Sequence, residues 1–388
     1  MDDIVNTTLS ADPLDRIKER AFLLYWNDIY KELYFPNTII LALYLLIGIP
    51  GNIVVILVYQ FRLRNEKDGR YFITPLAYLD LLALIITASL NLTRNTRQVL
   101  FPGHGVCRML LYLSYMSTCS SLFLLNVIAV QRFQKICRPF GRQMDVFWKK
   151  ASIGICVLVS TMLYIPVLFY YGVIEIRNPQ LGNITGYQCN KLQGSAAQLK
   201  GLRIFQGFGF FITISNVVVI TVLYIIITVS IVKQVRKMKS NKVQATGDSS
   251  GTPDTTAMSY VSKHQTSTSA ATESSEALES SVHSMSKLEP TKQKKAHQKS
   301  DARRGAFRVS FMFMTISFVG FLAYIPSWTF IVIETNNPVF WKSMSTTVFH
   351  VCLALRRMYM LNHFANPFIY GVFDIAFRQE IRKLFCVK

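Results

Sequence analysis

The stretch CRMLLYLSYMSTCSSLFLLNVIAVQR, residues 107–132, decides the fold that we expect for this chain. No acidic or basic side chain lies between Arg108 and Arg132. About 20 such residues in a helix are enough to cross the hydrocarbon core of a bilayer. At about 1.5 Å per residue, a helix places Cys107 and Arg132 roughly 37 Å apart, at opposite mouths of the membrane. The stretch therefore predicts a membrane-spanning helix that ends on an arginine.

The composition of the whole chain agrees with a membrane protein. Of its 388 residues, 51% are hydrophobic and 16% are charged, and the formal net charge is +20. The cations flank apolar segments and form no soluble basic face, so nucleic-acid binding is not expected. Residues 1–35 are rich in acids and lack the short apolar core of a cleavable signal peptide, so the spans themselves are expected to direct membrane insertion.

Similar apolar segments recur along the sequence. With residues 107–135 they make seven expected spans, the others being 39–59, 72–93, 151–173, 204–232, 309–333 and 346–373. The last is the weakest, because Arg356 and Arg357 interrupt it. We expect an all-α membrane protein, a seven-transmembrane helix bundle with a short amphipathic helix 8.

The loop charges predict how the bundle is oriented. Lys and Arg gather in the first, third and fifth connections and after the last span, which places the N-terminus outside and the C-terminus in the cytoplasm. Two glycosylation sequons, at Asn6 and Asn183, fall on the expected outer side. Cys107 and Cys189 are the only cysteines there, and since the exterior is oxidising, we predict a disulfide between them.

These spans divide the chain into five regions. The predicted regions are an extracellular tail (1–35), transmembrane helices 1–5 with their loops (36–239), a disordered cytoplasmic third loop (240–300), helices 6 and 7 (301–371), and the amphipathic helix 8 with a short tail (372–388). Disorder is expected in the third loop because it is rich in Ser, Thr and Lys and nearly free of aromatic residues. Cys386, beside the basic amphipathic helix, is a palmitoylation candidate.

Four motifs now resemble one family. They are Gly51-Asn52 in the first span, LxxxD ending at Asp80 in the second, the Cys-to-Arg spacing of the third, and NPFIY at 366–370. Together they resemble rhodopsin-type G-protein-coupled receptors over residues 36–386, apart from the third inner loop. The resemblance implies a plasma-membrane receptor with an extracellular ligand and a heterotrimeric G protein, and with arrestin and receptor kinases as further partners at the third loop.

The resemblance also implies a switch at the inner face. Arg132 matches the arginine that contacts the G protein when helix 6 moves outward. The other matching positions are Tyr224, Pro326, Asn366, Pro367 and Tyr370. Several family residues are replaced, namely by Gln131, Phe133, Cys156, Asn216, Gly320 and Tyr324. Because Gln131 takes the place of an acid and the inner end of helix 6 offers only cations, we expect raised signalling without ligand.

Polar residues in the middle of the spans match the family's sodium pocket. Asp80 lies at mid-membrane depth, where an unpaired carboxylate is costly and marks function. By resemblance, the pocket consists of Asp80, Ser121, Asn362 and Asn366, with sodium as an allosteric modulator and no other cofactor. His363 stands where the family has a small hydroxyl residue. The alternative is a water-filled polar network without an ion.

The outer half of the bundle is the expected ligand pocket. Ser114 replaces the aspartate of amine receptors and Met360 replaces the retinal lysine of opsins, so neither an amine nor retinal is the expected ligand. Arginines fall at the outer helix ends instead: Arg94, Arg108, Arg203 and Arg356. They either meet lipid headgroups or bind an anion, and Arg356, the deepest, favours an anion. Tyr324 completes the candidate pocket.

Two kinds of ligand fit these features, a peptide with an acidic group and a small organic acid. A predicted hairpin around Cys189 and the CRPF segment at 137–140 resemble the peptide-receptor branch, which favours a neuropeptide. The sequence has no HExxH, GxSxG or P-loop pattern, so no enzyme is expected, and no internal repeat suggests a transporter. A non-signalling decoy is the remaining alternative, because of the altered switch residues.

Overall fold

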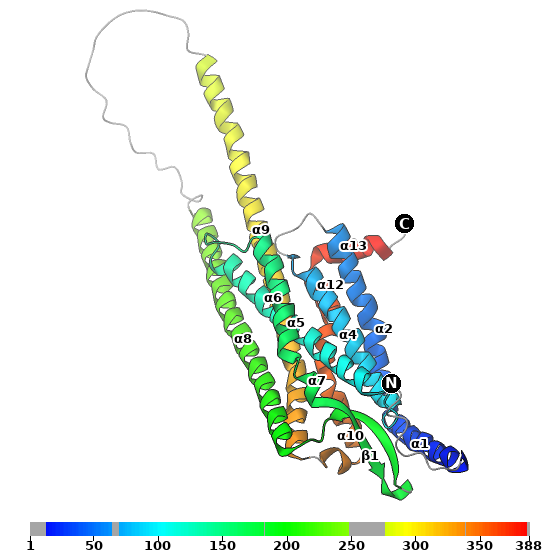
Figure 1. Cartoon of the computed structure of the whole chain (residues 1–388). Coiled ribbons are helices and arrows are strands. Elements are labelled where there is room, and N and C mark those ends of the chain that lie inside the picture. Colours follow the sequence, from blue (N-terminus) through cyan, green and yellow to red (C-terminus); the bar gives the residue numbers. More distant parts are fainter. Residues whose placement is uncertain (1–12, 64–69, 182, 248–275, 338, 386–388) are drawn as a thin grey trace, which may run out of the picture. The chain divides into compact units, whose positions relative to one another are not determined.

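The computed structural model describes residues 13–63, 70–181, 183–247, 276–337 and 339–385. It divides into two compact units, one comprising residues 1–226 and 309–388 and the other residues 227–308. Everything that positions the candidate site belongs to the first unit, and most of the helices and strand β1 are labelled in Figure 1.

Within the described residues, six helical segments are long and apolar enough to cross a membrane. Four of them are α2 (Phe35–Leu57) with η1 (Val58–Arg62), α4 (Ile73–Thr96), α5 (His104–Cys137), and α6 (Val146–Tyr164) with α7 (Val167–Tyr170). The other two are the part Ala196–Lys237 of α8 (Ala196–Gly247) and the part Arg304–Asn336 of α9 (Glu276–Asn336). Asp145 caps the start of α6 by accepting a hydrogen bond from the Trp148 amide at 2.9 Å. The predicted apolar runs therefore fold as helices.

The seventh span is built from short pieces. It comprises α10 (Thr346–Arg356), the 3-10 turn η4 (Met358–Met360), α11 (Leu361–Phe364) and α12 (Asn366–Phe373). The first break falls at Arg357, where the sequence pattern is weakest, and the second falls before Pro367, which lacks an amide hydrogen to continue the helix. Another helix, α13 (Ile375–Phe385), follows it. The predicted seven-helix bundle with a short C-terminal helix is thus confirmed.

A two-stranded hairpin joins α7 to α8. Strands β1 (Tyr171–Asn178) and β2 (Ile184–Lys191) pair antiparallel, with Val173 opposite Cys189, and the 3-10 turn η2 (Pro179–Leu181) lies between them. Asn183 follows that turn with φ of 60°, a left-handed conformation that asparagine tolerates better than most residues. The predicted hairpin is therefore present.

The N-terminal region contains a helix that the sequence analysis did not predict. Helix α1 (Pro13–Leu33) packs against α4 and β2. The Asn27 amide donates to the Thr96 carbonyl at 2.8 Å, and its oxygen accepts from the Val99 amide at 3.3 Å. Trp26 lies against Gly186 of the hairpin, where an added Cβ would come within 2.9 Å of the indole ring. The region 1–35 is thus more than a tail.

The third loop is also more helical than predicted. Helix α8 continues to Gly247 and α9 begins at Glu276, so helix extends into both ends of the segment 240–300, for which the sequence predicts disorder. Residues 276–300 are rich in Glu, Lys, Gln and Ala, which are good helix formers. Each end also extends a helix that is already nucleated. Residues 248–275 lie outside the described residues.

Candidate functional site

One end of the bundle carries the disulfide between Cys107 and Cys189, whose Cα atoms are 5.5 Å apart. We call it the disulfide end. The bond ties β2 to the first turn of α5 and confirms the predicted pairing. Strand β1 is fixed to the same helix, since Arg108 Nε donates to the Tyr171 carbonyl at 3.2 Å and His104 Nδ1 accepts from the Val173 amide at 3.2 Å. The hairpin is therefore held over the start of α5.

Arg356, the predicted anion contact, already has an anionic partner. Its guanidinium lies 2.9 Å from the carboxylate of Glu334 on α9 and 5.7 Å from the ring centre of Trp341. The Trp341 indole donates to the other Glu334 oxygen at 2.6 Å. The sequence analysis missed Glu334, although it stands just past the last apolar residues of the sixth predicted span.

Two more arginines lie close to Arg356. Arg94 donates to the Cys189 carbonyl at 3.2 Å, and Arg357, which is buried, donates to the side-chain oxygen of Asn91 on α4. In the described part of the chain, the Nε atoms of Arg94 and Arg357 have no hydrogen-bond partner. The charges of the three arginines are near enough to act on one another. With Glu334 the formal charge of this group is +2.

The ammonium group of Lys191, at the end of β2, interacts electrostatically with Glu334 and Arg356. Burial lowers its pKa below the usual value for lysine, and Arg356 lowers it further, while Glu334 acts in the opposite direction. Since both Glu334 and Arg356 influence Lys191, the end of the hairpin lies beside the arginine group, and the cationic character extends from α4 and α10 to the hairpin.

Tyrosines surround this cationic group. Tyr115 interacts electrostatically with Arg94, Tyr171, Tyr359 and Arg356. The Tyr359 hydroxyl accepts a hydrogen bond from the Asn91 amide at 3.3 Å, and the Tyr171 hydroxyl accepts one from Gln206 at 3.1 Å. The sequence analysis did not select these tyrosines, because residues on different spans are brought together only by packing. They give the site aromatic faces and hydroxyl groups beside its cations.

The other predicted pocket residues lie in different surroundings. Ser114 is buried and hydrogen-bonded to Thr87 at 2.7 Å, and Tyr324 is buried with its ring 6.3 Å from that of Tyr359. Arg203 is exposed on α8.

Met360 departs from the prediction that it lines the pocket. Its side chain has no exposed surface and packs in a core cluster with Leu41, Leu84 and Ala88. Met360 is the last residue of the 3-10 turn η4, which changes the helical phase of the seventh span. Met360 therefore belongs to the core between α2, α4 and η4.

In the middle of the bundle, two of the three predicted partners contact Asp80. Ser121 donates to Asp80 Oδ1 at 2.8 Å, and Asn366 Nδ2 donates to Oδ2 at 2.6 Å. Asn362 does not join them: its amide oxygen lies against Gly320 of α9, where any Cβ would collide with it. Gly320, noted in the sequence as a replacement for phenylalanine, thus makes room for Asn362.

The opposite end of the bundle carries Arg132, and we call it the Arg132 end. Arg132 has 1% of its surface exposed. Its Nη2 donates to Gln131 Oε1 at 3.1 Å, and its guanidinium lies 5.0 Å from the ring centre of Phe313 on α9. Phe133 faces another cation, since the guanidinium of Arg138 lies 5.7 Å from its ring centre. A neutral amide and an aromatic face thus contact the arginine.

The remaining switch candidates lie on α8, α9 and α12. Tyr224 and Tyr370 are both buried, and the ring of Tyr370 makes an edge contact with Tyr59 at 5.8 Å. Pro326 lies within α9, and Pro367 is in the first turn of α12. The predicted switch residues are therefore placed on four helices (α5, α8, α9 and α12).

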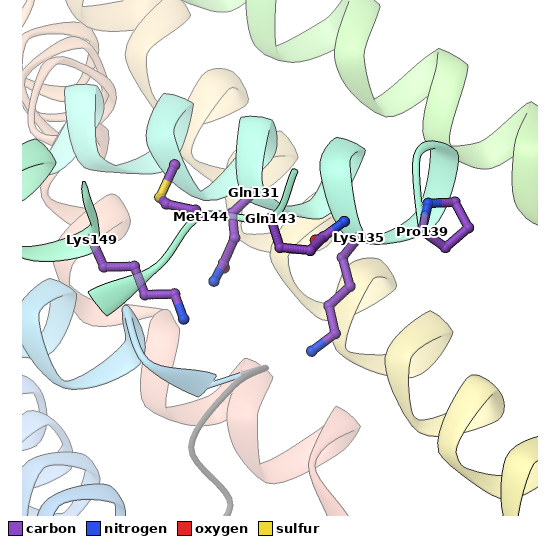
Figure 2. A pocket seen from close by; sticks show the side chains of 6 residues that line it. All are labelled: Gln131, Lys135, Pro139, Gln143, Met144 and Lys149. Carbon is purple, nitrogen blue, oxygen red and sulfur yellow. The ribbon is translucent and has the colours of Figure 1, made fainter. Parts of the chain in front are cut away.

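A hollow opens beside Arg132. It is lined by Gln131, Lys135, Pro139, Gln143, Met144 and Lys149. Figure 2 shows the polar ends of Gln131, Lys135 and Lys149 directed toward the same open space. The Gln143 amide holds the turn that forms one wall by donating to the carbonyl of Arg138 at 2.9 Å. Among the described residues, the lining contains two cations and no acid.

The predicted modification sites are only partly described. Asn183 is exposed at the hairpin turn. Asn6 and Cys386 lie outside the described residues.

The helix order, the disulfide and the buried polar residues agree with a match to a family of known proteins. The model of the rhodopsin family of seven-transmembrane receptors matches residues 51–370. This chain belongs to that family. It is therefore a multi-pass membrane receptor of the G-protein-coupled class and not an enzyme.

Several receptors that are named after peptides are similar to this receptor over part of its length. It is 26% identical to the tachykinin-like peptides receptor 99D of Drosophila melanogaster, over 42% of this chain and 31% of that protein. It is 30% identical to the neuropeptide Y receptor type 4 of Mus musculus, over 32% of this chain and 33% of that protein. It is 27% identical to the cholecystokinin receptor of Xenopus laevis, over 37% of this chain and 32% of that protein. These matches span about a third of the length of each relative.

The fold comparison covers nearly the whole receptor. Squid rhodopsin superposes with a TM-score of 0.61 at 15% identity, over 92% of this chain and 86% of that chain. Such a likeness at low identity shows the shared seven-helix fold.

Proposed function

We propose that this receptor binds a neuropeptide with an acidic group at the disulfide end and activates a heterotrimeric G protein at the Arg132 end. In this proposal the disulfide end faces the outside of the plasma membrane, with the N-terminus extracellular and the C-terminus cytoplasmic. The observation that carries the proposal is the group of three arginines and one acid, beside a hairpin held by the disulfide.

The charge of the group favours an anionic ligand. The group contains three arginines and one carboxylate, and among the described residues two of the guanidinium groups have an Nε–H without a partner. A buried donor without an acceptor is costly, and a carboxylate that satisfies it forms a strong, charge-assisted hydrogen bond. Arg94 and Arg356 are only partly buried, whereas Arg357 is nearly closed off. We therefore assign the ligand contact to Arg94 and Arg356, with Arg357 strengthening the field behind them.

The hairpin and the relatives favour a peptide over a small organic acid. A two-stranded lid offers backbone groups and side chains over a length that a peptide can use, while a small acid needs only the arginines and tyrosines. The relatives named above are receptors for peptides by their names. A small organic acid remains the alternative ligand, and a non-signalling decoy the alternative function.

The proposal includes further contacts that the family resemblance suggests. Arrestin and receptor kinases are expected to bind the third inner loop, and anionic lipids to meet the basic inner face. Glycans at Asn6 and Asn183 and a palmitoyl group at Cys386 would agree with this orientation.

A peptide screen tests the proposal. Cells that express the receptor with a promiscuous G protein are exposed to a peptide library and to a panel of small organic acids. A peptide agonist should lose potency at least about tenfold, or about 1.4 kcal/mol, in Arg94→Gln and in Arg356→Gln. The matched control is Arg203→Gln, which removes the same charge from an exposed position on α8.

Three results would contradict parts of the proposal. Equal potency in all three variants would remove the arginine group from the ligand site. Activation by small acids alone would favour the alternative ligand. Peptide binding without G-protein recruitment would favour the decoy.

A further inference from the structure

Asp80 is fully buried and hydrogen-bonded at both of its carboxylate oxygens. Ser121 from α5 and His363 from α11 meet Oδ1, each at 2.8 Å, and Asn366 from α12 meets Oδ2 at 2.6 Å. His363 has no exposed surface either. The sequence analysis did not predict the contact between the His363 imidazole and Asp80. The ring occupies Oδ1 of the carboxylate that the family resemblance assigns to sodium.

The histidine is held in place from three sides. Its carbonyl accepts a hydrogen bond from the Asn52 amide of α2 at 3.0 Å. Its Nε2 lies 3.5 Å from the Thr118 hydroxyl of α5, while Nδ1 faces Asp80 of α4. The backbone contact holds the residue in position, and the ring cannot leave Asp80 without also losing its contact with Thr118.

The groups around Asp80 are poor ligands for a sodium ion. Hard cations take oxygen ligands. Here Asn366 turns its NH₂ group toward the carboxylate, and the Asn362 oxygen lies against Gly320. Of the four predicted ligands, only Ser121 and Asp80 itself bring oxygen atoms together. Moreover, Oδ1 already has two hydrogen-bond partners, Ser121 and His363, so a cation at this oxygen would have to displace one of them.

We propose that the imidazole of His363 replaces the sodium ion at Asp80, so that this receptor does not bind sodium in the middle of its bundle. The positions match the family's pocket, but the residue set does not fit the ion. The inference depends on the Asp80 contacts and not on the proposed ligand, so either can fail without the other.

The experiment measures thermal unfolding of the purified full-length receptor in sodium chloride and in potassium chloride at equal ionic strength. The expected result for the native receptor is the same midpoint in both salts. His363→Ser removes the ring and restores a small hydroxyl residue, so it should gain a saturable, sodium-specific rise of a few degrees. That gain should vanish when Asp80→Asn is added to His363→Ser.

Two outcomes would overturn the proposal. One is a native receptor that sodium stabilises more than potassium, with the difference lost in Asp80→Asn. The other is a folded His363→Ser receptor that does not distinguish the two salts, because the ring would then not be what excludes the ion. If His363→Ser does not fold, His363→Asn takes its place in the comparison of the two salts. Sodium-specific stabilisation of the native receptor overturns the proposal whichever variant is used.

Discussion

Replacing Gln131 by an acid should lower signalling in the absence of ligand. Arg132 is almost completely buried, and it donates a hydrogen bond to the neutral Gln131 oxygen at 3.1 Å. Gln131→Glu keeps the shape of the side chain and turns this contact into an ion pair. Gln131→Asp supplies the acid that the family resemblance expects at this position.

The size of the effect follows from the geometry. Two unit charges about 4 Å apart attract by about 4 kcal/mol at an effective dielectric constant of about 20. Gln131 is 5% exposed, so burying the new carboxylate cancels part of this gain. A net bias of about 1.4 kcal/mol toward the resting state lowers a small active fraction roughly tenfold.

The assay is basal second-messenger output in transfected cells at matched surface levels of receptor. Native output should exceed that of mock-transfected cells and should fall in both acidic variants. The control is Gln134→Glu, which adds the same charge to α5 two residues beyond Arg132, and residues two apart in a helix do not face each other. The reasoning is refuted if native output equals the mock value for every G-protein class, or if the acidic variants signal as strongly as the native receptor.

Two further predictions concern bonds that hold the two ends of the receptor. Loss of the disulfide in Cys107→Ser or Cys189→Ser should abolish surface expression or ligand binding. The bond closes a loop of 82 residues and contributes roughly 4–5 kcal/mol in the chain-entropy model. Peptide mapping that finds both thiols free would exclude the bond. Arg70→Ala should destabilise the receptor by about 3 kcal/mol, because it leaves the buried carboxylate of Asp374 without the cation that now contacts it at 2.6 and 2.9 Å. Thermal unfolding measures this loss, and Asp374→Asn in the Arg70→Ala background should recover part of it; an additive double variant would contradict the pairing.

The sequence predicted features that depend on local composition or on position along one span. A membrane-spanning helix consists of consecutive, mostly apolar residues, because its backbone groups form their hydrogen bonds within the same segment. The seven spans follow from this, as does the weak point at Arg356 and Arg357, where the seventh span does break. The pairing of Cys107 with Cys189 was also accessible, since no other cysteine fell on the expected outer side.

Helix α1 and the helical ends of the third loop were missed for a different reason. Charged and apolar residues are mixed along residues 13–33, so no uninterrupted apolar run marks them as a membrane span. Trp26 and Asn27 instead hold α1 to the hairpin and to the end of α4. Such contacts join residues that are about 70 or more positions apart, and no local pattern contains them.

The tertiary structure alone decided which charges meet. Glu334 neutralises Arg356 from a neighbouring helix, and His363 reaches Asp80 across the middle of the bundle. The sequence places each of these groups at a depth along its own span. It does not give the rotation of one helix against another, which the packing of whole helix faces sets. A turn of about 100° per residue directs adjacent side chains to different neighbours, so the partners of a buried charge are known only when all the helices are in place.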